Sequence, residues 1–252
     1  MDSNDYVEFS VAEGVARLLF RTPPSEKPIR AEALRDIVRA LRALDADPAV
    51  RVMVFTVAGR PLFDVGLDGV REGDLVRQLS LLDCRWKMRV AQARTPTIAA
   101  IPGAAVDAGL ELALACDVRF ASTASTFAFS GVERGNVPGP IALQRLPAIV
   151  GHGAAADLFF TGRHIDAQEA WRIGLVTYVC EPDHLLDRVL DYARGIAGRS
   201  RLAIQGIKSA LQEHPVLSTG LESAYQSLLA YACHDQGARV DAGGPRVGGA
   251  GT

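Results

Sequence analysis

The sequence predicts an α/β fold with a parallel sheet, because strand-like and helix-like segments alternate along most of its 252 residues. Val50–Val57 and Thr97–Ile101 are short, almost uninterrupted apolar runs, which are typical of strands buried on both faces of a sheet. Ala33–Leu44 precedes the first run and repeats apolar residues at three- and four-residue steps, as an amphipathic helix does. Alternation of this kind predicts parallel strands joined by right-handed crossovers.

The remaining elements follow from the same patterns. Val7–Val11 and Val15–Phe20 are strand-like runs, and Glu13-Gly14 between them predicts a hairpin turn. A proline-rich loop covers Arg21–Arg30, and a further strand is expected at Val118–Ala121. Apolar periodicity predicts the other helices: Leu75–Ala93, Ala108–Ala115, Leu143–Val150, Ala154–Thr161, Ala167–Ile173, Leu185–Gly198, Ser200–Glu213 and Leu217–Tyr231.

These elements divide the chain into three parts. Residues 1–198 are expected to form a core domain, and residues 199–236 a C-terminal helical region. Residues 237–252 are rich in Gly, Ala and Arg, which predicts a disordered tail.

Composition limits the partners and the compartment. The chain has 27 basic and 29 acidic residues and a formal net charge of −2, so neither nucleic acid nor an anionic membrane is an expected partner. Cys84, Cys116, Cys180 and Cys233 form no CxxC pair, so we expect buried free thiols and no metal site. No apolar signal segment or membrane span of roughly 18 residues is evident. We therefore expect a soluble, cytoplasmic protein.

Three segments carry the candidate chemistry, and the first of them follows a buried strand. Arg60–Asp68 reads Arg-Pro-Leu-Phe-Asp-Val-Gly-Leu-Asp. Proteins of the α/β class place ligand-binding loops after their strands. Gly66 permits a positive φ angle or a close approach by a ligand. An ordinary strand-to-helix loop fits the same residues.

The second segment passes from a strand through small residues into a helix that opens with Ala108-Gly109. The first turn of a helix has N–H groups without intrahelical partners at its positive end. Such donors stabilise an oxyanion. Glu111 follows about one turn later and would face the same site, although spacing alone favours an exposed helix-face carboxylate. Asp107 fits a helix N-cap.

The third segment, Phe127–Pro140, is punctuated by glycine and proline and precedes a predicted helix. Together the three segments resemble the crotonase superfamily, the enoyl-CoA hydratase/isomerase family, in order and spacing. The resemblance covers about Val7–Gln212, and its most specific part is the second segment. The matching residues are Phe63–Asp68, Ile98–Gly103, Glu111–Asp117, Phe127, Gly135, Pro138-Gly139, Arg145-Leu146, Leu158–Arg163 and Ala170–Val176.

The resemblance implies a spiral of β-β-α units followed by a helical region that assembles a trimer or hexamer. It implies a coenzyme A thioester as the substrate and no permanently bound cofactor. It assigns the oxyanion hole to the N–H groups of Leu67 and Ala108, and the principal acid/base role to Glu111. The substrate is then expected to contact Gly66, Asp68, Gly109, Ser130 and Gly131, and its coenzyme A tail to contact Arg30, Arg71 and Lys208.

The chain also departs from the family pattern. Hydratases of the family use two glutamates, but the second position is Gly131 here, preceded by Ser130 in place of proline. In an extended chain, Glu133 would share a face with position 131 and is the candidate replacement. Asp64 and Asp107 stand where the family has small residues, and their charges would oppose an enolate unless they are neutralised or turned away.

These departures leave several functions open. The leading hypothesis is a lyase or isomerase that acts on a coenzyme A or carrier-protein thioester through an enolate, with Glu111 moving the proton. One alternative is ordinary hydration with Glu111 and Glu133, and another is a non-catalytic protein that binds acyl thioesters. Naphthoate synthases of the superfamily also have glycine at the position of Gly131 and use bicarbonate as the base, which gives a further alternative.

Overall fold

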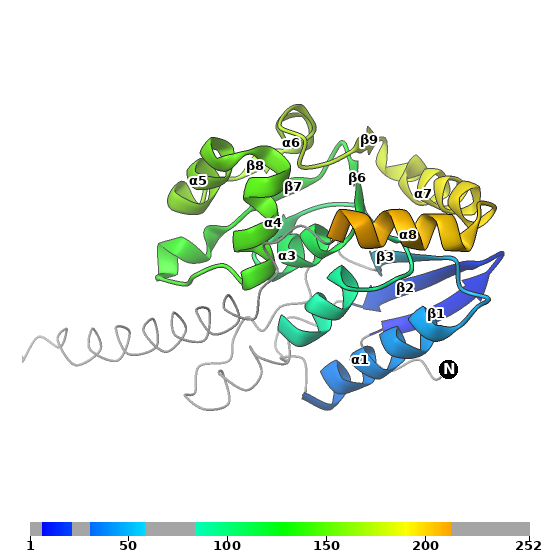
Figure 1. The fold of residues 1–252 in the computed structure, drawn as a ribbon. Coiled ribbons are helices and arrows are strands. Elements are labelled where there is room, and N and C mark those ends of the chain that lie inside the picture. Colours follow the sequence, from blue (N-terminus) through cyan, green and yellow to red (C-terminus); the bar gives the residue numbers. More distant parts are fainter. Residues whose placement is uncertain (1–6, 22–30, 59–83, 213–252) are drawn as a thin grey trace, which may run out of the picture.

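Two β-sheets and the helices around them form the described part of the chain, residues 7–21, 31–58 and 84–212 of a computed structural model (Figure 1). The predicted hairpin is confirmed: β1 (Val7–Ala12) pairs antiparallel with β2 (Val15–Arg21). Glu13 and Gly14 turn between them with φ angles of 51° and 79°. The left-handed conformation at Gly14 is one that glycine adopts at no steric cost.

The larger sheet has six strands in the order β1-β2-β3-β4-β6-β9. From β2 onward the neighbouring strands run parallel. This confirms the α/β fold class and the three predicted inner strands. The strands after β2 are β3 (Val52–Ala58), β4 (Thr97–Ile101), β6 (Val118–Ser122) and β9 (Tyr178–Cys180).

Successive residues of β3 face two different hydrophobic cores. Met53 and Phe55 belong to the larger core, and Val52 and Val54 belong to the smaller one. The smaller core is closed by α7 (Pro182–Ala197), whereas the larger core contains residues of α1, of the helix at residues 84–91 and of α3. Because both faces are covered, the inner strands are apolar at almost every position.

A second, smaller sheet of order β5-β7-β8 brings two parts of the site together. β5 (Ala105–Val106) pairs parallel with β7 (Thr126–Ala128), and β8 is Ile165–Asp166. β5 continues through Asp107 into α3 (Ala108–Ala115), and β7 leads to the 3₁₀-helix η1 (Ser130–Arg134). The pairing therefore places the start of α3 beside the start of η1. The sequence analysis did not predict these strands, because two or three residues show no period.

The remaining helices occupy the predicted regions, with shifted ends. The helix expected from Leu143 begins at Pro140, where proline at the first position sacrifices no helical hydrogen bond. Of the expected helix at Leu75–Ala93, residues 84–91 are helical and those before Cys84 lie outside the described residues. The other helices are α1 (Ala31–Ala46), α4 (Pro140–Val150), α5 (His152–Thr161) and α6 (Ala167–Arg172).

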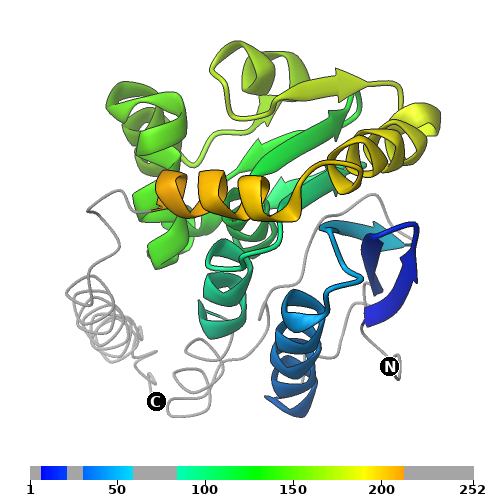
Figure 2. The same ribbon diagram turned by 45° about the vertical axis from the view of Figure 1, so that its right-hand side comes forward.

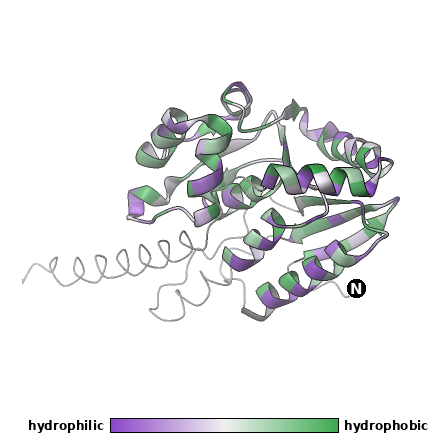
Figure 3. Cartoon of the chain, viewed as in Figure 1, coloured by the Kyte–Doolittle hydropathy of each residue, from purple (hydrophilic) through white to green (hydrophobic). Residues whose placement is uncertain are grey.

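The last described helix, α8 (Arg201–Gln212), crosses the end of the helix at residues 84–91 (Figure 2). Lys208 Nζ donates to the Thr95 carbonyl at 2.9 Å, and Gln212 Nε2 donates to the Ala91 carbonyl at 2.7 Å. Apolar and polar residues alternate along α8 (Figure 3). Its apolar side chains include three exposed ones, Leu202, Ile207 and Leu211. The predicted helix at Leu217–Tyr231 lies outside the described residues, and the three-part division of the chain stays a prediction.

Cys84, Cys116 and Cys180 are buried free thiols, as predicted, and Cys233 lies outside the described residues. Among the helices that the structure describes, none has both the length and the apolarity needed to cross a membrane.

Candidate active site

Helix α3 starts directly after Asp107, whose backbone has an unusual conformation. Asp107 has φ 46° and ψ −106°, and its own N–H donates to the carbonyl of Ala128 on β7 at 3.0 Å. A positive φ at a residue other than glycine costs roughly 1–3 kcal/mol and is frequent at functional sites. Seven of the eight residues of α3 are buried, starting with Gly109. The helix therefore lies inside the protein, and only its first residue, Ala108, is half-buried.

Ala108 was expected to supply one of the two oxyanion donors. It is the first residue of α3, so its N–H has no acceptor within the helix. Within the described part of the chain, no hydrogen bond is formed by this N–H. It lies at the positive end of the helix dipole. The second expected donor, Leu67, and the expected contacts Gly66 and Asp68 lie outside the described residues.

Glu111 is buried rather than exposed on the helix surface, with a relative exposure of 5%. Its Oε2 lies 3.1 Å from Nζ of Lys87, and the exposures of these two side chains are 7% and 0%. On another side, the carboxylate lies against Gly139, where a Cβ atom would overlap both of its oxygens. Gly139 directly precedes α4. The carboxylate is thus held between an ammonium group and a bare stretch of backbone.

Lys87 is a site residue that the sequence analysis missed. It lies on the helix at residues 84–91, and Cys84, Lys87 and Ala91 are spaced by three and four residues. All three are buried, so Lys87 occupies an apolar position of an amphipathic helix. A lysine at such a position indicates a buried partner of opposite charge, because an unpaired buried charge is strongly unfavourable. That signal was available in the sequence.

Asp107 is not the side-chain N-cap that we predicted, since its side chain makes no capping bond to α3. Its Oδ1 accepts from the Gly131 N–H at 3.0 Å. Its Oδ2 accepts from Ser130 Oγ at 3.2 Å and from Arg134 at 3.3 Å. The positive φ of Asp107 directs its carboxylate toward η1. Its charge is therefore balanced by Arg134, which removes the expected conflict with an oxyanion.

The structure contradicts the extended chain that we expected after Ser130. Ser130–Arg134 forms η1, so residues 131 and 133 do not share a face. Gly131 is buried, whereas Glu133 is exposed. A Cβ on Gly131 would lie 3.4 Å from Asp107 Oδ1, so Asp107 fills part of the space beside Gly131. Glu133 does not replace the missing glutamate in this arrangement.

Two arginines, the buried Arg119 and the half-buried Arg145, bind the opposite end of α3. Arg119 Nη1 donates to the Cys116 carbonyl at 2.8 Å, and Arg145 Nη1 donates to the carbonyls of Leu114 and Ala115 at 2.9 and 3.0 Å. Burial lowers the pKa of Arg119 to about 10 and also lowers the pKa of Arg145. Cations at a helix C-terminus are favourable, and these two fix the helix that carries Glu111.

Of the three cations expected for a coenzyme A tail, the described residues include Lys208. Lys208 is buried and lies 2.6 Å from Asp117 Oδ2, and it also donates to a backbone carbonyl. A contact with a substrate would require this ion pair to break. Arg30 and Arg71 lie outside the described residues.

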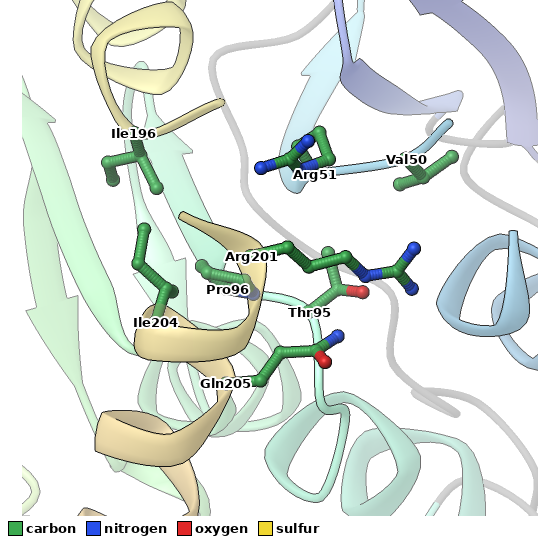
Figure 4. Close-up of a pocket in the computed structure, with 8 residues that line it drawn as sticks. All are labelled: Val50, Arg51, Thr95, Pro96, Ile196, Arg201, Ile204 and Gln205. Carbon is green, nitrogen blue, oxygen red and sulfur yellow. The ribbon is translucent and has the colours of Figure 1, made fainter. Parts of the chain in front are cut away.

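A small recess elsewhere lies between α8 and the residues that precede β3 and β4 (Figure 4). Thr95 lines it, and the buried Oγ1 of Thr95 has no hydrogen-bond partner within the described chain. None of the predicted site residues lines the recess: its lining is Val50, Arg51, Thr95, Pro96, Ile196, Arg201, Ile204 and Gln205. It therefore contributes nothing to the site around Glu111.

Comparisons with known proteins show which family and fold this chain resembles. Residues 10–235 match the model of the family described as enoyl-CoA hydratase/isomerase. A probable enoyl-CoA hydratase of Rhizobium meliloti is 37% identical over 86% of this chain and 86% of the relative. The crotonyl-CoA hydratase of Syntrophomonas wolfei is 34% identical over 80% of this chain and 79% of the relative. The crystal structure of enoyl-CoA hydratase from Bacillus anthracis superimposes with a TM-score of 0.79 at 26% identity, covering 91% of this chain and 90% of that one.

Proposed function

Because the chain belongs to the enoyl-CoA hydratase/isomerase family, we propose that it is a lyase or isomerase that acts on an acyl-CoA or carrier-protein thioester through an enolate, with Glu111 as its principal acid/base. The observation that carries this proposal is the placement of Glu111. Glu111 follows Ala108 by about one turn, and its carboxylate is buried. The half-buried N–H of Ala108 forms no hydrogen bond within the described residues. A donor and a base are thus offered by a single rigid helix.

The proposed chemistry begins at the thioester carbonyl. The N–H groups of Ala108 and Leu67 would donate to its oxygen, and the positive end of α3 would favour the developing negative charge. Glu111 then takes a proton from a carbon near the carbonyl, and the electron pair moves to the thioester oxygen. Return of the proton to another carbon gives an isomer. If the enolate instead re-forms the carbonyl and expels a leaving group from its β-carbon, Glu111 passes its proton to that group and the elimination gives a lyase product. Coenzyme A enters as part of the substrate, and no permanent cofactor is needed.

Hydration is a second candidate, because the relatives at 34% and 37% identity carry hydratase names. It requires a base for water and a proton for carbon. Glu111 would have to serve both steps, since Gly131 carries no carboxylate and Glu133 is exposed. This makes hydration the weaker candidate for this chain.

The tail of the substrate and the assembly complete the proposal. Arg30 and Arg71 are the proposed cations for the coenzyme A phosphates, and reversing their charges should raise KM and leave kcat nearly unchanged. A trimer or hexamer is proposed from the exposed apolar residues Leu202, Ile207 and Leu211 on α8. Light scattering at micromolar concentration tests the assembly, and a clean monomer would contradict it.

The main test is a panel of acyl-CoA thioesters incubated with the enzyme in H₂O and in D₂O, with products followed by mass spectrometry. Isomerisation leaves the mass unchanged in H₂O, decarboxylation removes carbon dioxide and hydration adds water. Glu111→Gln should lower kcat by roughly 10²–10⁴-fold. Glu133→Gln is the matched control and should lower it far less. Equal losses would indicate a two-carboxylate hydratase, and the absence of any turnover across the panel would support a binding protein.

A further inference from the structure

The ion pair between Lys87 and Glu111 is almost completely buried. Lys87 Nζ lies 3.1 Å from Oε2 of Glu111, and the Lys87 side chain has no exposed surface. The helix that carries Lys87 is firmly held. Its Ala91 carbonyl accepts from Arg145 at 3.3 Å and from Gln212 at 2.7 Å. The position of the ammonium group relative to α3 is therefore fixed by the fold.

A carboxyl group as buried as Glu111 is neutral at physiological pH unless a nearby cation compensates the lost hydration. A buried lysine needs an anion for the same reason. Breaking such a pair by removing one partner is strongly unfavourable, because a charge is then left alone. Each of the two groups thus favours the charged form of the other.

We propose that Lys87 is a positioning residue that keeps Glu111 ionised and holds its carboxylate against Gly139, so that Glu111 begins the reaction as a base. This inference rests on the proposed function. The Lys87 side chain has no exposed surface and its ammonium group touches Glu111, so we infer that it acts on the substrate through that carboxylate.

The proton balance follows directly. The ionised Glu111 takes a proton from the substrate carbon, and the electron pair of the C–H bond moves to the thioester oxygen. Lys87 keeps its own proton throughout. The positive charge of Lys87, no longer matched by Glu111, then favours the anionic enolate. Return of the proton to carbon restores the ion pair.

Other charged groups around the pair are directed elsewhere in the described structure. Helix α3 carries no second ionisable side chain. Asp107 is paired with Arg134, and Arg145 on α4 binds carbonyls at the far end of α3. The remaining charged side chains on the helix of Lys87 and on η1 are exposed: Arg85, Arg89, Glu133 and Arg134. Lys87 is therefore the charged side chain of the described structure expected to dominate the titration of Glu111.

An NMR titration tests the ionisation without any substrate. In protein labelled with ¹³C-glutamate, the Glu111 carboxyl signal is the one that disappears in Glu111→Gln. In the wild type it should stay at the ionised position from pH 5 to pH 8. In Lys87→Met its midpoint should rise by about 1–3 pH units. A neutral Glu111 in the wild type, or no shift in Lys87→Met, would overturn the proposal.

Kinetics separate positioning from a merely structural role. Lys87→Met should lower kcat by about 10-fold or more below the shifted midpoint, and kcat should recover as the pH rises. In the Glu111→Gln background the same substitution should cause no further loss. Arg89→Met, an exposed charge removal on the same helix, should leave kcat unchanged. An equal loss of kcat at every pH and in both backgrounds would refute the positioning role of Lys87. Inactivity of the wild type on all thioesters would instead refute the proposed function, and the result of the NMR titration would still stand.

Discussion

The carboxylate of Glu111 occupies the space in which a side chain on Gly139 would begin. Glu111 lies on α3, and Gly139 is the residue directly before α4. Gly139 has φ −66° and ψ 165°, which any residue adopts without strain. Glycine is required here for space alone, because the carboxylate packs on its Cα.

Gly139→Ala should therefore move the base and leave the fold intact. A misplacement of about 1 Å can lower the rate roughly 10²-fold, so we expect kcat to fall by about 10–100-fold with a small change in Tm. The control is Gly153→Ala on α5, where an added Cβ has no atom within 4 Å. A full-rate Gly139→Ala enzyme would show that Glu111 does not act from its observed position.

Asp107 links the start of α3 to η1, and removing its carboxylate should loosen both. Asp107→Ala leaves the Gly131 N–H and Ser130 Oγ without their acceptor, at roughly 1–3 kcal/mol of stability. Asp107→Gly should destabilise less, because glycine relieves the positive φ. Arg134→Gln removes the exposed ion-pair partner of Asp107 and should change stability by less than about 1 kcal/mol.

Urea unfolding of these three variants checks the order. Equal losses for Asp107→Ala and Arg134→Gln would mean that the ion pair, and not the bonds to η1, carries the contribution of Asp107.

Lys208 is expected to support stability rather than substrate affinity. Its ammonium group lies between Asp117 and the Thr95 carbonyl, and Asp117 also accepts from the backbone and hydroxyl of Thr97. Lys208→Met should lower the free energy of unfolding by roughly 2–3 kcal/mol and leave KM unchanged. Ser209→Ala, exposed on the same helix, is the control. A raised KM with unchanged stability would restore Lys208 as a contact for the coenzyme A tail.

Much of the fold was predictable because long elements carry a periodic pattern. The inner strands β3 and β4 and helix α3 were located from apolar runs and small residues. The short strands β5 and β7 were missed, because two or three residues pair only through partners distant in the sequence. Yet this small sheet sets Asp107 beside η1.

Part of the candidate site could be predicted from the sequence, where a residue type at a given position implies one role. The helical start at Ala108 was found where the residue pattern predicted it, whereas Glu111, which spacing alone placed on an exposed helix face, is buried. Lys87 was missed because its role depends on a partner 24 positions away. The extended conformation expected around Glu133 was wrong, because Ser130–Arg134 forms the 3₁₀-helix η1, which is followed by Gly135 in a left-handed conformation.

Cys116, at the end of α3, should make the stability of the protein depend on alkaline pH. Burial, followed by the charge of Asp117, raises the pKa of this thiol from 9.0 to about 12. Between these two values the unfolded chain loses the thiol proton and the folded chain keeps it. The contribution of this group to stability is therefore complete below pH 9 and is lost as the pH rises toward 12, at about 1 kcal/mol per pH unit.

Urea unfolding of the wild type and of Cys116→Ala between pH 8 and pH 11 measures the difference in slope. The variant should start less stable, because it leaves a small cavity, but should lose less stability above pH 9. Parallel pH dependences would show that Cys116 ionises equally in both states. Iodoacetamide at pH 8 gives an independent reading, because a buried neutral thiol should be alkylated only after unfolding.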